Sequence, residues 1–236
     1  MKKRVLSILL CLVLVLGIVP TSTFAEVAAS GKHSSHCVCG KTNCRGEGHN
    51  PNTTWKAITL MSDISKDGNY YLTSNVQLNT LAWICNYNVN LCLNGKTLTN
   101  KNKSDTDNYA VIKVASGKSL SITDCHSGDA VGKITHAEDG KGGCGIENLG
   151  TLILWNGNIT GNGLSIKNNG DPGGGVINSG TFTMNGGSIT GNTAQGTDGS
   201  WRNGGGVHNK GTFTMNAGTI SGNKCSYGGG VYNYNT

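Results

Sequence analysis

Short segments of alternating apolar and polar residues fill the second half of the chain. Phe182 and Met184 alternate with Thr181 and Thr183, which is the period of two that a β-strand shows when one of its faces is buried. Glycines bound these segments and permit sharp turns between them. No segment between the strands has the pattern of a helix, so the chain is predicted to be an all-β protein made of short strands.

The alternating segments belong to an internal repeat. Its copies lie at 143–162, 173–192 and 204–223, and a fourth begins at Gly228. Each copy contains three short strands, which in the second copy lie near Val176, Phe182 and Ile189. A single copy cannot bury its apolar side chains, whereas stacked copies place equivalent side chains above one another at the ~4.8 Å spacing of paired strands. The repeat therefore predicts a parallel β-helix solenoid with three short strands per coil.

Aligning the copies sorts their residues into columns that keep their chemical type. The apolar columns are Ile146, Val176, Val207 and Val231; Leu152, Phe182 and Phe213; Leu154, Met184 and Met215; and Ile159, Ile189 and Ile220. The asparagine columns are Asn148, Asn178, Asn209 and Asn233, and Asn162, Asn192 and Asn223. Stacked asparagine side chains can hydrogen-bond along the axis of such a stack. We expect the apolar columns inside the solenoid and asparagine ladders beside them.

The repeat GGGVxNxGTFTMNGGSITGN resembles those of right-handed parallel β-helix proteins of bacterial surfaces, which are often called adhesin-like. These proteins share the pectin-lyase-like architecture of pectate lyases. The resemblance is close over 143–236 and looser over 68–142, where it implies irregular coils. It implies a right-handed parallel β-helix. Because no polar cap follows the last coil, we expect either a longer protein or an end-to-end partner at that coil.

The N-terminus has the features of an export signal. Lys2, Lys3 and Arg4 precede an apolar run over 5–19, and small residues allow cleavage after Ala25. The apolar run is too short to span a membrane as a helix. We therefore predict a signal peptide at 1–25, a secreted or cell-wall-associated mature protein without a membrane span, and a Cys/His-rich leader and linker at 26–67.

Composition adds little beyond this outline. Glycine is frequent, at 37 of 236 residues, and charged residues make up only 14%. Removing a signal that carries three basic residues and no acidic ones lowers the formal charge from +6 to +3 (6 − 3 = 3). No run of lysine or arginine forms a patch, so no nucleic-acid partner is expected.

The leader contains a dense group of cysteine and histidine residues. Cys37, Cys39, Cys44 and His49, with His36 as an alternate, could supply the four tetrahedral ligands of a structural Zn²⁺ ion. The competing interpretation is a disulfide framework, because the mature chain has an even number of cysteines and is predicted to be exported. For Cys92, Cys125, Cys144 and Cys225 we expect burial or pairing instead of metal ligation. No other cofactor is predicted.

The repeat strands offer little for catalysis. The outward column beside one asparagine ladder reads Glu147, Ile177, His208 and Tyr232, with a single carboxylate, whereas glycosidases need two carboxylates around the scissile bond. His208 is expected to be a surface histidine. No catalytic residue is predicted, and the alternative activity is that of a polysaccharide lyase or glycoside hydrolase on an acidic polysaccharide.

Recognition is the function that this pattern favours. Insertions follow the third strand in two copies, at 163–172 and 193–203, and insertions in repeat proteins often form the binding face. Trp201 and Arg202, with Asp198 and Gln195, are the candidate ligand-binding residues. The sequence therefore predicts non-enzymatic adhesion to, or recognition of, a glycan or surface-protein ligand.

Overall fold

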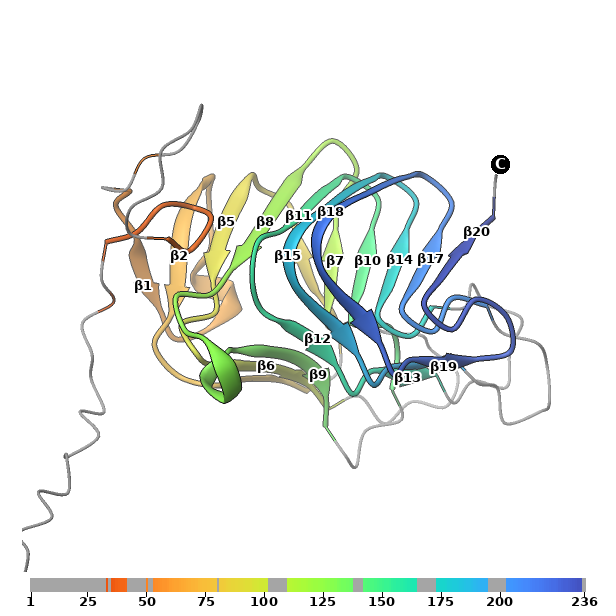
Figure 1. Cartoon of the computed structure of the whole chain (residues 1–236). Helices are drawn as coiled ribbons and strands as arrows, with labels where there is room; N and C mark the ends of the chain where they lie inside the picture. Colours follow the sequence, from red (N-terminus) through yellow and green to blue (C-terminus); the bar gives the residue numbers. More distant parts are fainter. Residues whose placement is uncertain are drawn as a thin grey trace, which may run out of the picture. The chain divides into compact units, whose positions relative to one another are not determined.

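The chain forms two units, Met1–Ser34 and Ser35–Thr236, in a computed structural model. The residues that the structure describes are 33, 35–41, 50, 53–79, 81–101, 110–137, 142–164, 173–194 and 203–234. The signal peptide predicted at 1–25 lies outside them. The second unit is an all-β solenoid in which every strand pairing is parallel (Figure 1).

Each coil adds strands to three faces of the solenoid, which confirms the parallel β-helix with three strands per coil. The first face holds β1 (Lys56–Ile58), β2 (Gly68–Leu72), β5 (Val89–Cys92), β8 (Ser119–Thr123) and β11 (Thr151–Leu154). The second holds β3 (Val76–Leu78), β6 (Thr97–Asn100), β9 (Lys133–His136) and β12 (Asn158–Thr160). The long strands β15 (Thr181–Thr190) and β18 (Thr212–Ser221) cross both faces and join them into one 11-stranded sheet.

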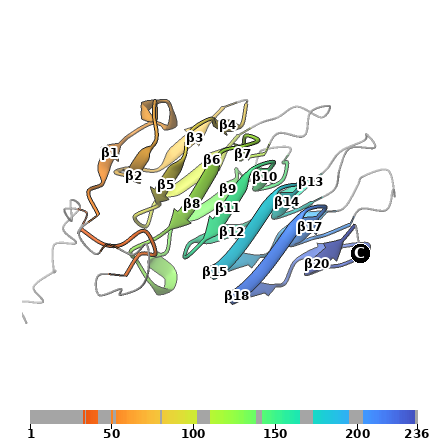
Figure 2. The ribbon, with the colours of Figure 1, turned by 90° about the horizontal axis from the view of Figure 1, so that it is seen from above.

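The third face is a separate sheet, and a small strand follows the second face in the last coils. The third face contains β4 (Trp83–Cys85), β7 (Ile112–Val114), β10 (Ile146–Asn148), β14 (Val176–Asn178), β17 (Val207–Asn209) and β20 (Val231–Asn233). The small sheet contains β13 (Gly163–Leu164), β16 (Thr193–Ala194) and β19 (Lys224–Cys225). Seen from above, the rungs follow one another from β1 to β20 (Figure 2). β1 adds a rung within the stretch that the sequence assigned to leader and linker.

The helical content of the described residues is two single 3-10 turns, η1 (Met61–Asp63) and η2 (Gly128–Ala130). Within the same residues, none of the helices has the length and apolar character needed to cross a bilayer.

The apolar columns line the interior of the inner coils, as predicted, whereas Met215 in the long strand β18 is 44% exposed. Phe182 pairs in register with Leu152 and Phe213, and Val176 pairs with Ile146 and Val207. Phe182 is completely buried, and its ring lies 5.0 Å from that of Phe213 between centroids. Because each coil covers the apolar residues of the one before it, a continuous core runs through the stack.

The asparagine columns form the expected ladders. Asn148 Nδ2 donates to Asn178 Oδ1 and Asn178 Nδ2 donates to Asn209 Oδ1, both at 2.7 Å, and Asn209 continues to Asn233 at 3.0 Å. In the second ladder, Asn162 donates to Asn192 at 3.0 Å and Asn192 to Asn223 at 2.9 Å. The paired amides satisfy one another in a buried environment, where an unpaired amide would be costly.

A glycine precedes each of the strands β11, β15 and β18 and allows a close approach between the regular coils. A Cβ atom at Gly180 would collide with the carbonyl oxygen of Gly150 in the coil below, and one at Gly211 would collide with that of Gly180. The same glycine therefore recurs in every regular copy because the backbones touch at this corner.

His208 is not a surface histidine, contrary to the expectation. Its side chain is only 2% exposed, because Tyr232 of the next rung lies over it, with ring centroids 5.4 Å apart. The outward position of a strand does not guarantee exposure when a large aromatic side chain occupies the same column one coil away.

Candidate metal centre

Part of the Cys/His-rich leader, the segment 35–41, packs against the outer side of the first face. Cys37 and Cys39 are both buried and form a small apolar cluster with Val38 and Trp155, the residue that follows β11. Gly40 makes the closest approach: a Cβ atom there would lie 2.6 Å from both Thr123 Oγ1 and the Asp124 carbonyl oxygen. Gly40 also has a φ of 80°, a conformation that favours glycine. The turn can therefore dock only because this residue lacks a side chain.

His36 of the leader meets two cysteines of the solenoid. The possible ligand atoms of His36, Cys92 and Cys125 all lie within 4.8 Å of one another. The Sγ atoms of Cys92 and Cys125 are 3.8 Å apart. His36 and Cys92 are completely buried, and Cys125 is partly exposed. Three soft or borderline donors that converge in this way form a cluster that could bind a metal ion.

Two hydrogen bonds hold the histidine in place. His36 Nδ1 lies 2.6 Å from its neighbour's carbonyl oxygen, that of Cys37. A backbone carbonyl can only accept, so Nδ1 carries the proton and Nε2 remains as the nitrogen with a lone pair. Trp55 Nε1 donates to the carbonyl oxygen of His36 at 2.9 Å, and the Trp55 ring lies against the imidazole. Metal-binding histidines typically donate their other ring N–H in this way.

The two cysteines are held by rigid parts of the solenoid. Cys92 ends β5, where its neighbour Leu91 points into the core, so Cys92 points to the outer face. Its register partner is Thr123 of β8. The Oγ1 atom of Thr123 is buried without a hydrogen-bond partner in the structure, which places an unsatisfied polar atom beside the cluster.

Cys125 lies in the turn after β8, which the buried carboxylate of Asp124 anchors. Asp124 Oδ2 accepts hydrogen bonds from the backbone N–H groups of Gly95 and Gly132, each at 2.9 Å, and Oδ1 accepts one from that of His126 at 2.6 Å. Several charge-assisted hydrogen bonds to one carboxylate fix the turn from both sides. The position of Cys125 is therefore set by the solenoid, independently of the leader.

Burial and mutual contact alter the protonation of the cluster. Burial lowers the pKa of His36, but its hydrogen bonds with Cys125 and Cys37 raise it more, and its pKa lies above the ordinary value. Burial, with a smaller contribution from Cys125, raises the pKa of the Cys92 thiol far above its usual range. Without a metal ion, the buried thiol therefore keeps its proton.

A second, overlapping group consists of Asp124, Cys125 and His126. His126 Nδ1 lies 3.2 Å from Asp124 Oδ1 and 3.6 Å from Cys125 Sγ. Because the Asp124 carboxylate already accepts backbone hydrogen bonds, it serves to hold the turn. We assign the candidate centre to His36, Cys92 and Cys125 for this reason.

The sequence-based ligand candidates are distributed differently. Cys37 and Cys39 are buried in the leader turn, and His36, proposed as an alternate ligand, is a leader residue at the cluster. Cys44 and His49 lie outside the described residues. None of the cysteines within the described ranges forms a disulfide.

Sequence reasoning did not associate Cys92 and Cys125 with the leader. The two residues are 33 positions apart, about one coil of the solenoid. Aligning the first-face strands of the irregular coils would have put both cysteines at the same edge, but these coils lack the clear repeat of the later ones. The contact with His36 has no sequence signal at all.

The four candidate ligand-binding residues Gln195, Asp198, Trp201 and Arg202 lie outside the described residues. The strands that lead into the two insertions are described. β13 pairs with β16, and β16 with β19, so that Gly163 lies beside Thr193 and Thr193 beside Lys224. The insertions therefore start from neighbouring positions on one edge of the stack.

The single carboxylate of the outward column, Glu147, forms an ion pair with Lys113 of the preceding coil at 2.9 Å. The adjacent acids Asp105 and Asp107, and Glu138 and Asp139, lie outside the described residues. A carboxylate that faces a lysine one rung away has an ordinary structural role.

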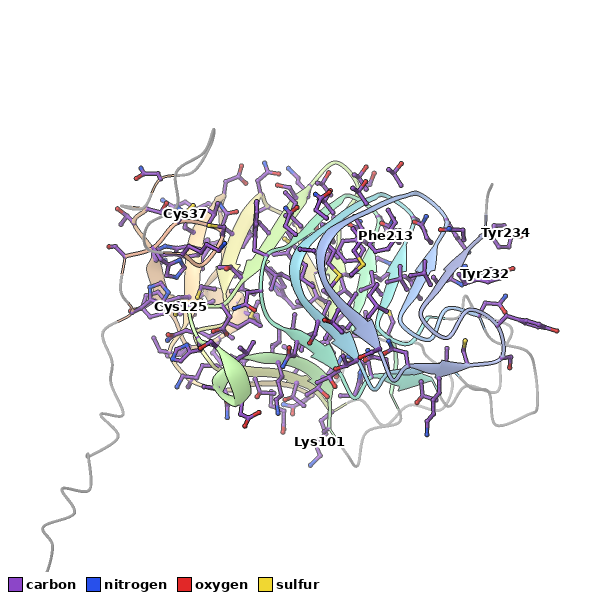
Figure 3. The ribbon with its side chains drawn as sticks, in the orientation of Figure 1. Cys37, Lys101, Cys125, Phe213, Tyr232 and Tyr234 are labelled. Atoms are coloured by element: carbon purple, nitrogen blue, oxygen red, sulfur yellow. The ribbon has the colours of Figure 1, made fainter. Side chains whose placement is uncertain are left out.

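Figure 3 shows Cys37 and Cys125 on one side of the view and Tyr232 and Tyr234 of the last coil on the other. The cysteines of the candidate centre belong to the rungs of β5 and β8, with β1 and β2 before them and β11, β15 and β18 after them on the first face. Comparison of the chain with protein-family models, with curated proteins and with solved structures finds no match.

Proposed function

We propose that the chain is an exported, non-enzymatic recognition solenoid whose N-terminal leader is fastened to the outer face by a structural zinc ion. The single observation that carries the zinc proposal is the 3.8 Å separation of the Cys92 and Cys125 sulfurs. Zinc–sulfur bonds of about 2.3 Å at the tetrahedral angle place two sulfurs about 3.8 Å apart. The spacing of the two thiols therefore suits a shared zinc ion.

The donor types support zinc over harder cations. Thiolate sulfur and imidazole nitrogen are ligands that Zn²⁺ favours, whereas Mg²⁺ and Ca²⁺ favour oxygen. His36 Nδ1 also donates to the backbone carbonyl oxygen of Cys37 at 2.6 Å. Hydrogen bonds of this kind orient the histidine ligands of zinc sites. Zinc bound there would have a structural role once a fourth protein donor completes its coordination.

We propose that the fourth donor comes from the leader. Its sequence offers Cys37, Cys39, Cys44 and His49 as candidates. A fourth protein ligand would leave no open position for water, which suits a structural site.

The short length of the docked leader segment suggests a role for the ion. In the short segment 35–41, His36, Cys37 and Cys39 are buried, and the His36 carbonyl oxygen accepts the hydrogen bond from Trp55. A segment of this size cannot bury enough apolar surface to order itself. Metal binding free energy would supply the difference, because a site assembled from two parts of a chain couples binding to docking.

Metal analysis of the purified, reduced chain tests the zinc proposal. We expect one zinc ion per chain, which the single variants Cys92→Ser, Cys125→Ser and His36→Ala lose. Cys225→Ser, which changes a partly exposed cysteine of the last coil, is the matched control and should retain the ion. Variants at Cys37, Cys39, Cys44 and His49 identify the fourth donor. Reduced protein without zinc, or a Cys92→Ser variant that keeps full zinc content, contradicts the proposal.

We further propose that the edge carrying the two insertions recognises a glycan or a surface protein. The support is the stacking of β13, β16 and β19, which starts each insertion from neighbouring rungs. Trp201, Arg202, Asp198 and Gln195 supply an aromatic ring and hydrogen-bonding groups of the kind that dominate binding surfaces.

A glycan-array screen tests this recognition role. We expect specific binding that Trp201→Ala and Arg202→Ala abolish. Leu81→Ala, which changes an exposed apolar residue elsewhere on the solenoid, should bind normally. Equal binding by all variants contradicts the assignment of these residues, and release of unsaturated uronic-acid products during the screen indicates a lyase instead.

A further inference from the structure

The sulfur pair of the candidate centre can react as well as bind. Cys92 and Cys125 hold their Sγ atoms 3.8 Å apart, whereas a disulfide bond is about 2.05 Å long. Both residues sit on fixed backbone, Cys92 at the end of β5 and Cys125 in the turn anchored by Asp124. Joining the two sulfurs therefore requires the gap between them to close by less than 2 Å, a distance that side-chain rotation covers.

We propose that Cys92 and Cys125 form a redox latch, in which their oxidation to a disulfide removes both thiolates from the zinc ion and releases the leader from the solenoid. The latch rests on the zinc site proposed above and names its regulation. A sulfur that forms a disulfide no longer offers a thiolate to a metal, so the two states exclude each other.

Exposure sets the order of the two chemical steps. Cys125 is partly exposed, whereas Cys92 has no exposed surface. The Cys125 thiolate attacks one sulfur of a low-molecular-weight disulfide, which forms a mixed disulfide and expels one thiolate. The Cys92 thiolate then attacks Cys125 Sγ and expels the second thiolate.

The reaction is balanced without any further reagent. The two thiolates of Cys92 and Cys125 lose two electrons, which reduce the oxidant to two thiolates, and the zinc ion leaves as free Zn²⁺. The released thiolates take up protons from water. An exported chain meets disulfide oxidants of this class, because disulfides form and persist outside the cytosol. Reduction by thiols reverses both steps and restores the pair for metal binding.

Release of the leader follows from what remains after oxidation. His36 would lose the two thiolates that share the ion with it. The leader segment 35–41 would then be held by direct packing, such as that of Cys37 and Cys39 on Trp155, and by hydrogen bonds such as that from Trp55, without the metal ion. Trp55 and Trp155 both lie at this contact, so its opening changes the environment of two tryptophans.

The experiment starts from the reduced, full-length chain whose zinc content has been measured. Oxidised glutathione is added, and zinc release is followed with a chromogenic chelator. Disulfides are mapped by peptide mass spectrometry, and tryptophan fluorescence reports the leader. We expect zinc release at least about tenfold faster than with the same concentration of reduced glutathione, together with a Cys92–Cys125 peptide and a fluorescence change. Dithiothreitol and added zinc should reverse all three changes.

Two variants test the order of attack. In Cys92→Ser, we expect a stable glutathione adduct on Cys125, because no second thiol resolves it. In Cys125→Ser, the buried Cys92 should remain unmodified over the same time. Cys225→Ser should behave as the wild type does.

The outcomes separate the two proposals. A reduced chain without zinc overturns the zinc site, and the latch with it. Zinc that is present but stays bound under oxidation overturns the latch alone. A disulfide that joins Cys125 to a cysteine other than Cys92, or an adduct that forms first on Cys92, also overturns the latch and leaves the zinc site standing.

Discussion

Asn178 donates a 2.7 Å hydrogen bond from Nδ2 to Oδ1 of Asn209, the equivalent residue one coil further along the solenoid. Asn178 also accepts a 2.7 Å hydrogen bond from Asn148 on its other side and donates to the Thr212 carbonyl oxygen. It is completely buried. The side chain therefore links three coils at a place that water does not reach.

We predict that Asn178→Ala destabilises the solenoid by about 2–4 kcal/mol, because it leaves buried amide and carbonyl groups without partners. Urea denaturation measures the change. The control is Asn216→Ala, which removes an exposed hydrogen bond to Asn185 and should cost less than about 1 kcal/mol. An equal decrease in the free energy of unfolding in the two variants would show that the buried asparagine ladder stabilises the protein no more than an exposed hydrogen bond does.

Phe182 fills the core between Leu152 and Phe213 and has no exposed surface. We predict that Phe182→Ala lowers the free energy of unfolding by about 3–5 kcal/mol, since it combines lost burial with a cavity in a packed interior. Phe213→Ala should cost clearly less because its ring is only partly buried. A larger loss at Phe213 than at Phe182 would contradict this account of the core.

Gly40 and Gly117 provide a matched pair for testing how the leader docks. Both have a positive φ, 80° and 71°, so alanine causes backbone strain at either site. A Cβ atom at Gly40 collides with Thr123 and Asp124, whereas one at Gly117 meets no atom within 4 Å. We predict that Gly40→Ala displaces the leader, shifts the fluorescence of Trp55 and Trp155, and lowers zinc affinity.

Gly117→Ala should change neither the fluorescence nor the zinc affinity, although backbone strain lowers its free energy of unfolding by about 1–2 kcal/mol. Zinc affinity is measured by competition with a chromogenic chelator. If Gly40→Ala binds zinc as tightly as Gly117→Ala does, the close contact of the leader turn with β8 is not needed for the site.

The buried thiol of Cys85 is expected to make the protein less stable at alkaline pH. Burial raises the pKa of its thiol from 9.0 to about 11. As pH rises, the unfolded chain loses this proton first, so the stabilisation is complete below pH 9 and is lost as pH rises toward 11. A difference of about two pKa units corresponds to about 3 kcal/mol. Urea denaturation at pH 8 and pH 11 measures this loss.

Cys85→Ala should lose less stability between these two pH values than the wild type, by up to that amount. The comparison uses the difference between the pH values, so the constant effect of the smaller side chain cancels. Identical alkaline losses in the wild type and the variant would show that Cys85 does not couple folding to pH.

The regular coils could be predicted because each of them repeats the same sequence pattern of apolar residues, asparagines and glycines. Alternation identified the strands around Phe182 and Met184, and the repeat identified their neighbours, so that Val176, Phe182 and Ile189 have the register partners expected. The asparagine ladders followed for the same reason. Burial of His208 could not be predicted, since it depends on how the ring of Tyr232 lies in the next coil.

Only part of the candidate metal centre could be predicted from the sequence. Histidine and cysteine in the leader indicated metal chemistry and named His36 as an alternate ligand, but nothing local connected His36 with Cys92 and Cys125. These cysteines come from irregular coils of unequal length, in which the register partners Asn69 and Asn90 are 21 residues apart. A register that varies from coil to coil cannot be extended from the regular repeats.

The sequence by itself determined the winding of this chain, because period-two strands, recurrent glycines and columns of like residues have one way to bury their apolar side chains. Only the tertiary structure decided where the leader lies, because its docking depends on the fit of Gly40 against Thr123 and Asp124. This contact depends on how surfaces that are distant in sequence fit together, and no periodic sequence pattern predicts it.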